Sequence, residues 1–207
     1  MSYLSRIGRP ELIDLLLSLI VLIIAFSIVG ERRLGVEAVL ISAVGVGTGF
    51  LLHELAHKFV AQKYGYRAEY KASWSGLFFM IIMSFMEFIF AAPGAVMISK
   101  DTHFSDTSTM ITEEQLRIAL AGPMTNIILI VFFLMLAMAS RKMINPFLLE
   151  VAYFAFYINL ILAAFNLIPV DPFDGGKIFR GSHLVWAIVA VPTILLALPF
   201  FFGFRVI

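Results

Sequence analysis

Five long apolar runs restrict the folds open to this chain. They cover residues 15–30, 36–61, 118–140, 151–170 and 184–204. Each is close to the roughly 20 residues that a helix needs to cross a bilayer. Hydrophobic residues make up 61% of the chain, whereas soluble globular proteins hold about 45–50%. The sequence therefore predicts an all-α polytopic membrane protein with about five transmembrane helices, which we expect in the cell membrane.

The charge balance and the lack of cysteine narrow the choice of partners. The chain carries 15 basic and 14 acidic side chains, so it lacks the basic excess that marks nucleic-acid binding proteins, and we expect no such partner. It contains no cysteine, which excludes disulfides and thiolate metal sites. A bound metal must therefore be held by His, Asp or Glu.

A short polar motif, HELAH, interrupts the second apolar run near its end. Residues four apart share one face of a helix, so His53 and His57 can offer two imidazole nitrogens to one metal ion. In sites of this kind zinc lowers the pKa of a bound water to roughly 7, and the neighbouring glutamate takes its proton. We therefore predict His53 and His57 as metal ligands and Glu54 as the general base.

The alternative is an accidental match, because short motifs recur by chance. The membrane argues against it, since one charged side chain at the bilayer centre costs roughly 2.5–3.5 kcal/mol on insertion scales. Three ionisable groups on adjacent turns need a partner, and a divalent cation is the simplest one. Lys58 follows the motif, and we expect its long stem to carry the ammonium to the membrane interface without a catalytic role.

A third protein ligand must come from elsewhere in the chain. The fourth run ends in NLIPVDPFDGGK, where two prolines stop the helix and two glycines permit a tight turn. Irregular backbone at membrane depth is tolerated where it is buried in protein or lines a cavity, so a carboxylate from this segment can face the histidines. This reasoning favours the two aspartates without choosing between them. All candidates considered are His103, His183, Glu87, Asp171 and Asp174.

Three motifs together resemble the site-2 protease family of intramembrane zinc metalloproteases, peptidase family M50. They are HELAH in an apolar helix, AGPMTN at residues 121–126 and NLIPVDPFDGG, and the resemblance covers about residues 36–177. It implies one Zn²⁺ per chain with Asp174 as the third ligand, and Asn166 as a residue that holds the substrate or its oxyanion. Asp171 stands where the family more often has a small or apolar residue, and it stays open as the alternative ligand.

We expect one transmembrane protease domain over residues 1–207, in the compact form of the family without a PDZ or CBS domain. Its core covers residues 36–177, and a membrane-associated insertion covers about residues 72–99. Gly122 and Asn126 belong to the second motif, and we expect them to serve close packing between helices rather than chemistry.

The expected metal site constrains the topology. If the ends of the second and fourth spans meet at one metal, the segment between the second and third spans crosses the membrane an even number of times, most simply zero. We therefore predict a re-entrant element in which residues 77–90 enter or lie on the bilayer as a helix and residues 92–99 return as a strand. The family resemblance also implies a membrane-associated β element. Residues 94–98 are the candidate edge, which either binds an unwound substrate or plugs the cavity.

Basic residues outside the spans indicate the orientation, because positive charges favour the cytoplasmic side of a membrane. Nine lie on the predicted catalytic face and five on the opposite face, so we expect the active site toward the cytoplasm. The nine are Arg6, Arg9, Lys63, Arg67, Lys71, Lys100, Arg117, Lys177 and Arg180; the five are Arg32, Arg33, Arg141, Lys142 and Arg205.

The leading hypothesis is a zinc metalloendopeptidase that cuts transmembrane proteins or peptides within the bilayer. Membrane zincins that cut prenylated or soluble peptides form a second class, but they take a glutamate ligand from a later helix, and no later glutamate has the right context. From a different class, a metal transporter or a catalytically silent scaffold could use the same ligands. Glu54 separates these classes, because transport needs no general base beside the metal. The sequence leaves the oligomeric state open.

Overall fold

A computed structural model describes residues 7–29, 35–86, 93–100 and 112–201. Its elements are, in chain order, α1 (Arg9–Ile28), α2 (Val36–Val46), the π-helix η1 (Gly47–Leu51), α3 (Leu52–Lys63), β1 (Tyr66–Ala72), α4 (Trp74–Ser84), β2 (Gly94–Lys100), α5 (Thr112–Met143), α6 (Pro146–Asn166), α7 (Asp174–Gly181) and α8 (His183–Phe201).

Five helices in the described part of the chain are long and apolar enough to cross a membrane, as the sequence predicts. The second of them runs continuously through α2, η1 and α3, over Val36–Lys63. The third begins at Thr112, six residues before its apolar run, because two glutamates suit the first turn of a helix. The fourth ends at Asn166, short of the predicted residue 170, because the following proline cannot continue the helix.

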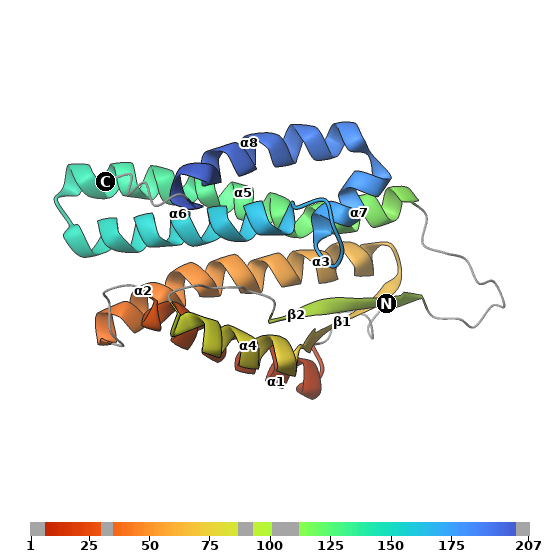
Figure 1. Cartoon of the computed structure of the whole chain (residues 1–207), viewed down its shortest axis with the longest axis horizontal. Helices are drawn as coiled ribbons and strands as arrows, with labels where there is room; N and C mark the ends of the chain where they lie inside the picture. Colours follow the sequence, from red (N-terminus) through yellow and green to blue (C-terminus); the bar gives the residue numbers. More distant parts are fainter. Residues whose placement is uncertain (1–6, 30–34, 87–92, 101–111, 202–207) are drawn as a thin grey trace.

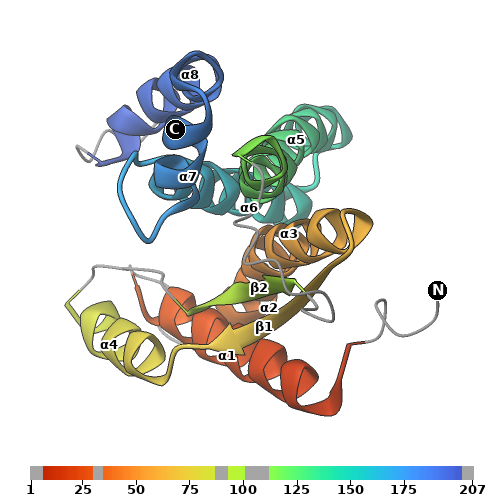
Figure 2. The same ribbon diagram turned by 90° about the vertical axis from the view of Figure 1, so that its right-hand side faces the viewer.

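The helices form two groups on either side of α3 (Figures 1 and 2). On one side, α5 and α6 pack along each other, with α7 and α8 beside them. On the other side, α1 supports α4 and the two strands. The helix that carries HELAH therefore lies between the two groups and contacts both α5 and the strands.

The strands β1 and β2 form an antiparallel pair, in which Tyr66 lies opposite Lys100 and Ala72 lies opposite Gly94. The sequence predicts the second strand, at residues 92–99, whereas β1 was not expected. Gly65 allows the turn after α3, because its φ of 81° is one that residues with a side chain rarely adopt. The pairing places the start of β1 beside the end of β2.

The helix α4 occupies part of the predicted re-entrant segment. Ser73 caps it by accepting a hydrogen bond from the Gly76 N–H at 3.2 Å. It ends at Ser84, whereas the sequence analysis predicted a helix up to residue 90. Residues 87–92 lie outside the described part of the chain.

The π-helix η1 directly precedes α3, and together with α2 it packs against α6. A methyl group added to Gly45 would touch Phe154 and the Ala155 backbone, and one added to Gly49 would touch Leu162 and Asn159. Small residues at these two positions, one turn apart, let the helices approach closely. The approach places polar groups of α6 behind the motif.

Candidate metal centre

Three ligand atoms from two helices converge at one point. His53 and His57 extend from α3, and Asp174 begins α7; their ligand atoms all lie within 4.8 Å of one another. The Nε2 atoms of the histidines are 3.0 Å apart, and the Asp174 Oδ2 lies 3.4 Å from the first and 2.9 Å from the second. Ligands about 2.0–2.1 Å from a tetrahedral zinc are about 3.3–3.4 Å apart. The three residues therefore fit a zinc site.

In each histidine ring, a hydrogen bond from Nδ1 fixes the direction in which Nε2 points. The Nδ1–H of His53 donates to the Asn126 Oδ1 at 2.5 Å, and the Nδ1–H of His57 donates to the Ile118 carbonyl at 2.7 Å. A carbonyl can only accept, so these tautomers leave both Nε2 lone pairs facing the Asp174 carboxylate. Such partners are the usual support of histidine ligands. Three buried acceptors that face one another need a cation between them.

Asn126 belongs to a polar network that the sequence analysis did not anticipate. Its Nδ2 donates to the Gly49 carbonyl and to the Asn159 Oδ1, both at 3.0 Å. Asn159 in turn donates to the Ala155 carbonyl at 2.8 Å, and both asparagines are fully buried. The network joins α5, α6 and η1 behind His53. The only signal in the sequence is an asparagine in the apolar part of each of two spans.

Gly122 packs directly against the two imidazoles. A methyl group added to its Cα would overlap the Nε2 atoms of both His53 and His57. The AGPMTN segment therefore contributes two features to the site: Gly122 leaves room for the two imidazoles because it has no side chain, and Asn126 supplies a hydrogen-bond acceptor.

Asp174 is held in place by the start of α7. The Gly175 Cα lies so close to the backbone of Leu167 and Ile168 that a side chain would overlap it, which explains the glycine after the aspartate. The Asp174 Oδ2 faces the histidines, and its Oδ1 accepts a hydrogen bond from the Lys177 Nζ at 3.2 Å. The carboxylate is thus oriented by a cation one turn along the same helix.

The other candidate ligands lie elsewhere. Asp171 is exposed and forms two hydrogen bonds with the Arg180 guanidinium, both 2.9 Å long; this bonding lowers the pKa of the Asp171 carboxyl. The ring of His183 packs against Phe179, with ring centroids 4.2 Å apart. His103 and Glu87 lie outside the described residues. The structure therefore brings Asp174, and not Asp171, to the two histidines.

A cavity of about 620 Å³ opens onto the candidate site. Half-buried Glu54 lines it, and the backbone of Val96 in β2 lies within hydrogen-bonding reach of the Glu54 carboxylate. Asn166 also lines the cavity while its Nδ2 donates to the Leu162 carbonyl at 3.0 Å. Lys177 lines the cavity as well. The predicted base, the predicted substrate contact and the three ligand residues thus surround one space.

The structure contradicts the expected exposure of the Lys58 ammonium. Its side chain is only 2% exposed and pairs with Glu11 of α1, which is also 2% exposed. The Lys58 ammonium is therefore held inside the protein by Glu11 and is not exposed at the surface. The sequence analysis missed the pairing because the two residues are 47 positions apart and no local pattern connects them.

Comparison with known proteins points to one family. The protein-family model described as "Peptidase family M50" matches residues 41–143 and 136–194 of the chain. A Methanocaldococcus jannaschii protein named "Putative zinc metalloprotease MJ0611" is 38% identical over 190 residues, which are 91% of this chain and 93% of that protein. "Zinc metalloprotease MJ0392" of the same organism is 31% identical over 130 residues, which are 63% of this chain and 30% of that protein. No solved structure gives a significant match.

Proposed function

The chain belongs to peptidase family M50, the site-2 protease family, and from that premise we propose that it is an intramembrane zinc metalloprotease. Its substrates are peptide bonds in or near transmembrane segments of other proteins. The observation that carries the proposal is the convergence of three buried ligand atoms, from His53, His57 and Asp174, beside the Glu54 carboxylate.

Each residue of the site has a proposed role. His53, His57 and Asp174 hold one zinc ion, which supplies Lewis-acid chemistry and, when bound, lowers the pKa of a water to roughly 7. Glu54 takes the proton of the attacking water and passes it to the leaving amine. Asn166 binds the substrate carbonyl or the negative charge that develops on its oxygen.

The depth of the site supports action within the bilayer. His53 lies ten residues before the end of α3, which is about 15 Å along a helix, in a membrane whose hydrocarbon core is roughly 30 Å thick. Water must reach this depth for hydrolysis, and the cavity beside Glu54 offers it a path.

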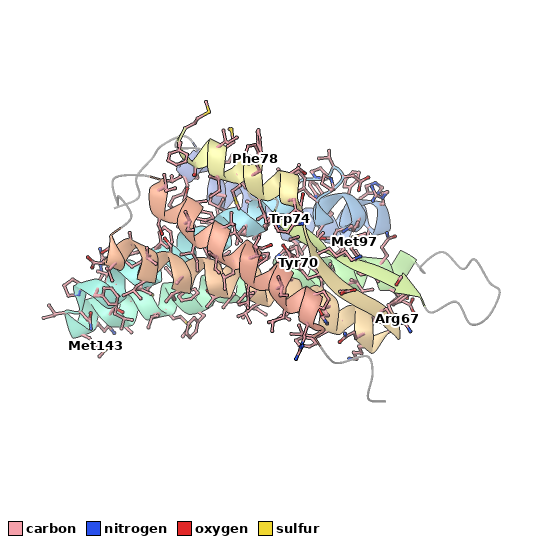
Figure 3. All side chains as sticks on the ribbon, turned by 90° about the horizontal axis from the view of Figure 1, so that it is seen from below. Arg67, Tyr70, Trp74, Phe78, Met97 and Met143 are labelled. Atoms are coloured by element: carbon pink, nitrogen blue, oxygen red, sulfur yellow. The ribbon has the colours of Figure 1, made fainter. Side chains whose placement is uncertain are left out.

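We assign α4 to the membrane as the predicted re-entrant element, within a single domain over residues 1–207. With 11 residues it is about 16 Å long, too short to cross. Its outer side is apolar: the side chains of Trp74 and Phe78 are 67% and 71% exposed, and that of Phe85, directly after the helix, is 71% exposed. Figure 3 shows Trp74 and Phe78 along this helix. Lipid is the environment in which such a surface is stable.

The open edge of β2 is the proposed substrate site. A helical substrate hides its carbonyls in its own hydrogen bonds, whereas an extended segment can add to a strand edge. Residues 94–98 of β2 line the cavity together with Glu54, so a peptide bound along them would lie beside the general base. The alternative is that these residues only plug the cavity. In that case, preventing backbone hydrogen bonds between β2 and the substrate would leave substrate binding unchanged.

Cleavage in proteoliposomes tests the proposal. The purified protein is reconstituted with a single-span substrate, zinc is removed with a chelator and then restored, and the products are mapped by mass spectrometry. We expect cuts within or next to the span, loss of cleavage on chelation and recovery with zinc. Zinc flux across the vesicle membrane without any cleavage would instead identify a transporter, and zinc binding with neither activity would identify a scaffold.

A further inference from the structure

The two-stranded sheet has two outer edges, which have different neighbours. The edge of β2 lines the cavity, whereas the edge of β1 faces α1. Figure 2 shows the sheet lying between α1 and α3. An uncovered strand edge would offer backbone groups to any extended segment, so the cover over β1 decides where such a segment can bind.

Two carboxylates of α1 take the place of a neighbouring strand. The Oε1 of Glu11 accepts a hydrogen bond from the Tyr70 N–H at 3.1 Å, and the Oδ2 of Asp14 accepts one from the Ala72 N–H, also at 3.1 Å. Residues three apart lie on one face of a helix, and N–H groups two residues apart point to the same edge of a strand. The two spacings match, so α1 satisfies alternate backbone donors of β1.

Glu11 also connects this edge to the helix of the metal motif. Its second oxygen, Oε2, pairs with the Nζ of Lys58, the residue directly after His57. Both side chains are 2% exposed. The Glu11 carboxylate thus bonds to β1 through one oxygen and to α3 through the other. These two contacts fix the position of the sheet along the axis of α3.

The same contacts extend to the general base. Tyr70 lies opposite Val96 in the strand pair, and the Val96 backbone is within hydrogen-bonding reach of Glu54. The Tyr70 hydroxyl donates to the Ser18 Oγ at 2.9 Å, which fastens the other end of its side chain to α1. Glu11 therefore acts on the position of β2 through Tyr70.

The free energy of folding alone does not explain why the buried pair is Glu11 and Lys58 rather than two apolar residues. Removing two charges from water is costly, and a well-packed apolar pair is often equally stable. An apolar pair would leave the Tyr70 N–H without an acceptor.

We propose that Glu11 and Lys58 are positioning residues that seal the outer edge of β1 and hold the open edge of β2 in register with Glu54, so that an extended substrate binds at that edge only. The inference rests on the proposed function.

A matched pair of double variants tests it. Glu11→Gln/Lys58→Met keeps an oxygen acceptor for the Tyr70 N–H, and Glu11→Leu/Lys58→Met does not; neither buries a charge. The variants are compared in proteoliposomes by KM and kcat for a single-span substrate, by zinc content, and by hydrogen–deuterium exchange at the Tyr70 amide.

We expect the leucine variant to raise KM about tenfold, because a strand pair with an unsatisfied buried N–H no longer holds β2 in place for the substrate. Both kcat and zinc content should be preserved, and the Tyr70 amide should exchange rapidly. The glutamine variant should restore both KM and amide protection. Wild-type KM in the leucine variant, or an equal rise in both variants, would overturn the proposal.

If the leucine variant does not fold, Asp14→Asn and Asp14→Leu make the same comparison at the Ala72 amide without disturbing the ion pair. The exchange measurement is independent of cleavage. A wild-type protein without proteolytic activity would refute the proposed function, whereas an unprotected Tyr70 amide in the wild type would refute the sealed edge.

Discussion

At the residue scale, the site depends on what each ligand touches on its far side. Both histidines donate their Nδ1–H to a fixed acceptor, and one oxygen of Asp174 accepts a hydrogen bond from Lys177. These contacts aim the remaining atoms at one point before a metal arrives. Removing partners of this kind commonly changes metal affinity by about 10–100-fold. We therefore expect the loss of Asn126 to weaken zinc binding through its contact with His53.

The choice between the two aspartates gives the first prediction. Asp174→Asn removes the negative charge that faces both histidines, so zinc affinity should fall by more than about tenfold. Asp171→Asn alters only an exposed pair with Arg180 and should retain zinc. Metal analysis of the two purified variants makes the comparison. Zinc loss in Asp171→Asn with full zinc in Asp174→Asn would reverse the assignment.

Gly122 gives the second prediction. Gly122→Ala places a methyl group against both Nε2 atoms, so zinc should be lost even though alanine favours a helix. Gly47→Ala is the matched control, because a methyl group there meets nothing within 4 Å. Zinc content and thermal unfolding are measured together. A Gly122→Ala protein that folds and binds one zinc would contradict the described packing.

Sequence reasoning found the residues of the site whose spacing is local and missed those whose partners are distant. The spacing of four between His53 and His57 was sufficient, and motif context favoured Asp174. The contact of Asn126 with His53 joins positions 73 apart, and the Lys58 pair joins positions 47 apart. No pattern within a helix encodes either of them.

At the element scale, the spans were predictable because an apolar run of sufficient length has few other folds open to it. The strand β1 was not, because YRAEYKA follows a polar helix end and is short. The signal that could have identified it is the alternation of apolar and charged residues in this segment, which matches the buried and exposed positions of the strand. The π-helix η1 leaves no such signal, since Gly47–Leu51 is compatible with an ordinary helix.

The strand pair gives the third prediction. A methyl group on Gly94 would overlap the Lys71 carbonyl and the Tyr70 hydroxyl, so Gly94→Ala should displace β2 from β1. We expect weaker cleavage of a single-span substrate, seen as a higher KM, with zinc content unchanged. Ser99→Ala, at an exposed position of the same strand, is the control. Equal KM values for the two variants would show that the position of β2 does not affect substrate binding.

At the scale of the whole molecule, the ends of α3 and α6 meet at one side, together with the sheet and α7 (Figure 1). The expected metal site predicted this arrangement, because it required the second and fourth spans to end at the same face. Whether that side faces the cytoplasm is predicted from the distribution of basic residues outside the spans. The fold itself does not determine this orientation.

Orientation gives the fourth prediction. The chain has no cysteine, so single cysteines report on one place each. Arg67 is exposed on β1, and Lys142 is exposed at the far end of α5. In intact cells, a membrane-impermeant maleimide should label Lys142→Cys but should label Arg67→Cys only after permeabilisation. Labelling of Arg67→Cys in intact cells would place the catalytic face outside.

The cleavage rate of Glu54→Gln tests the central claim most directly. Glutamine fills the same space but cannot take a proton, and loss of a general base costs about 100-fold or more in rate. The purified variant should bind one zinc per chain, as the wild type does, and should cut a reconstituted single-span substrate at least about 100-fold more slowly. Full cleavage by Glu54→Gln with zinc bound would contradict the proteolytic mechanism.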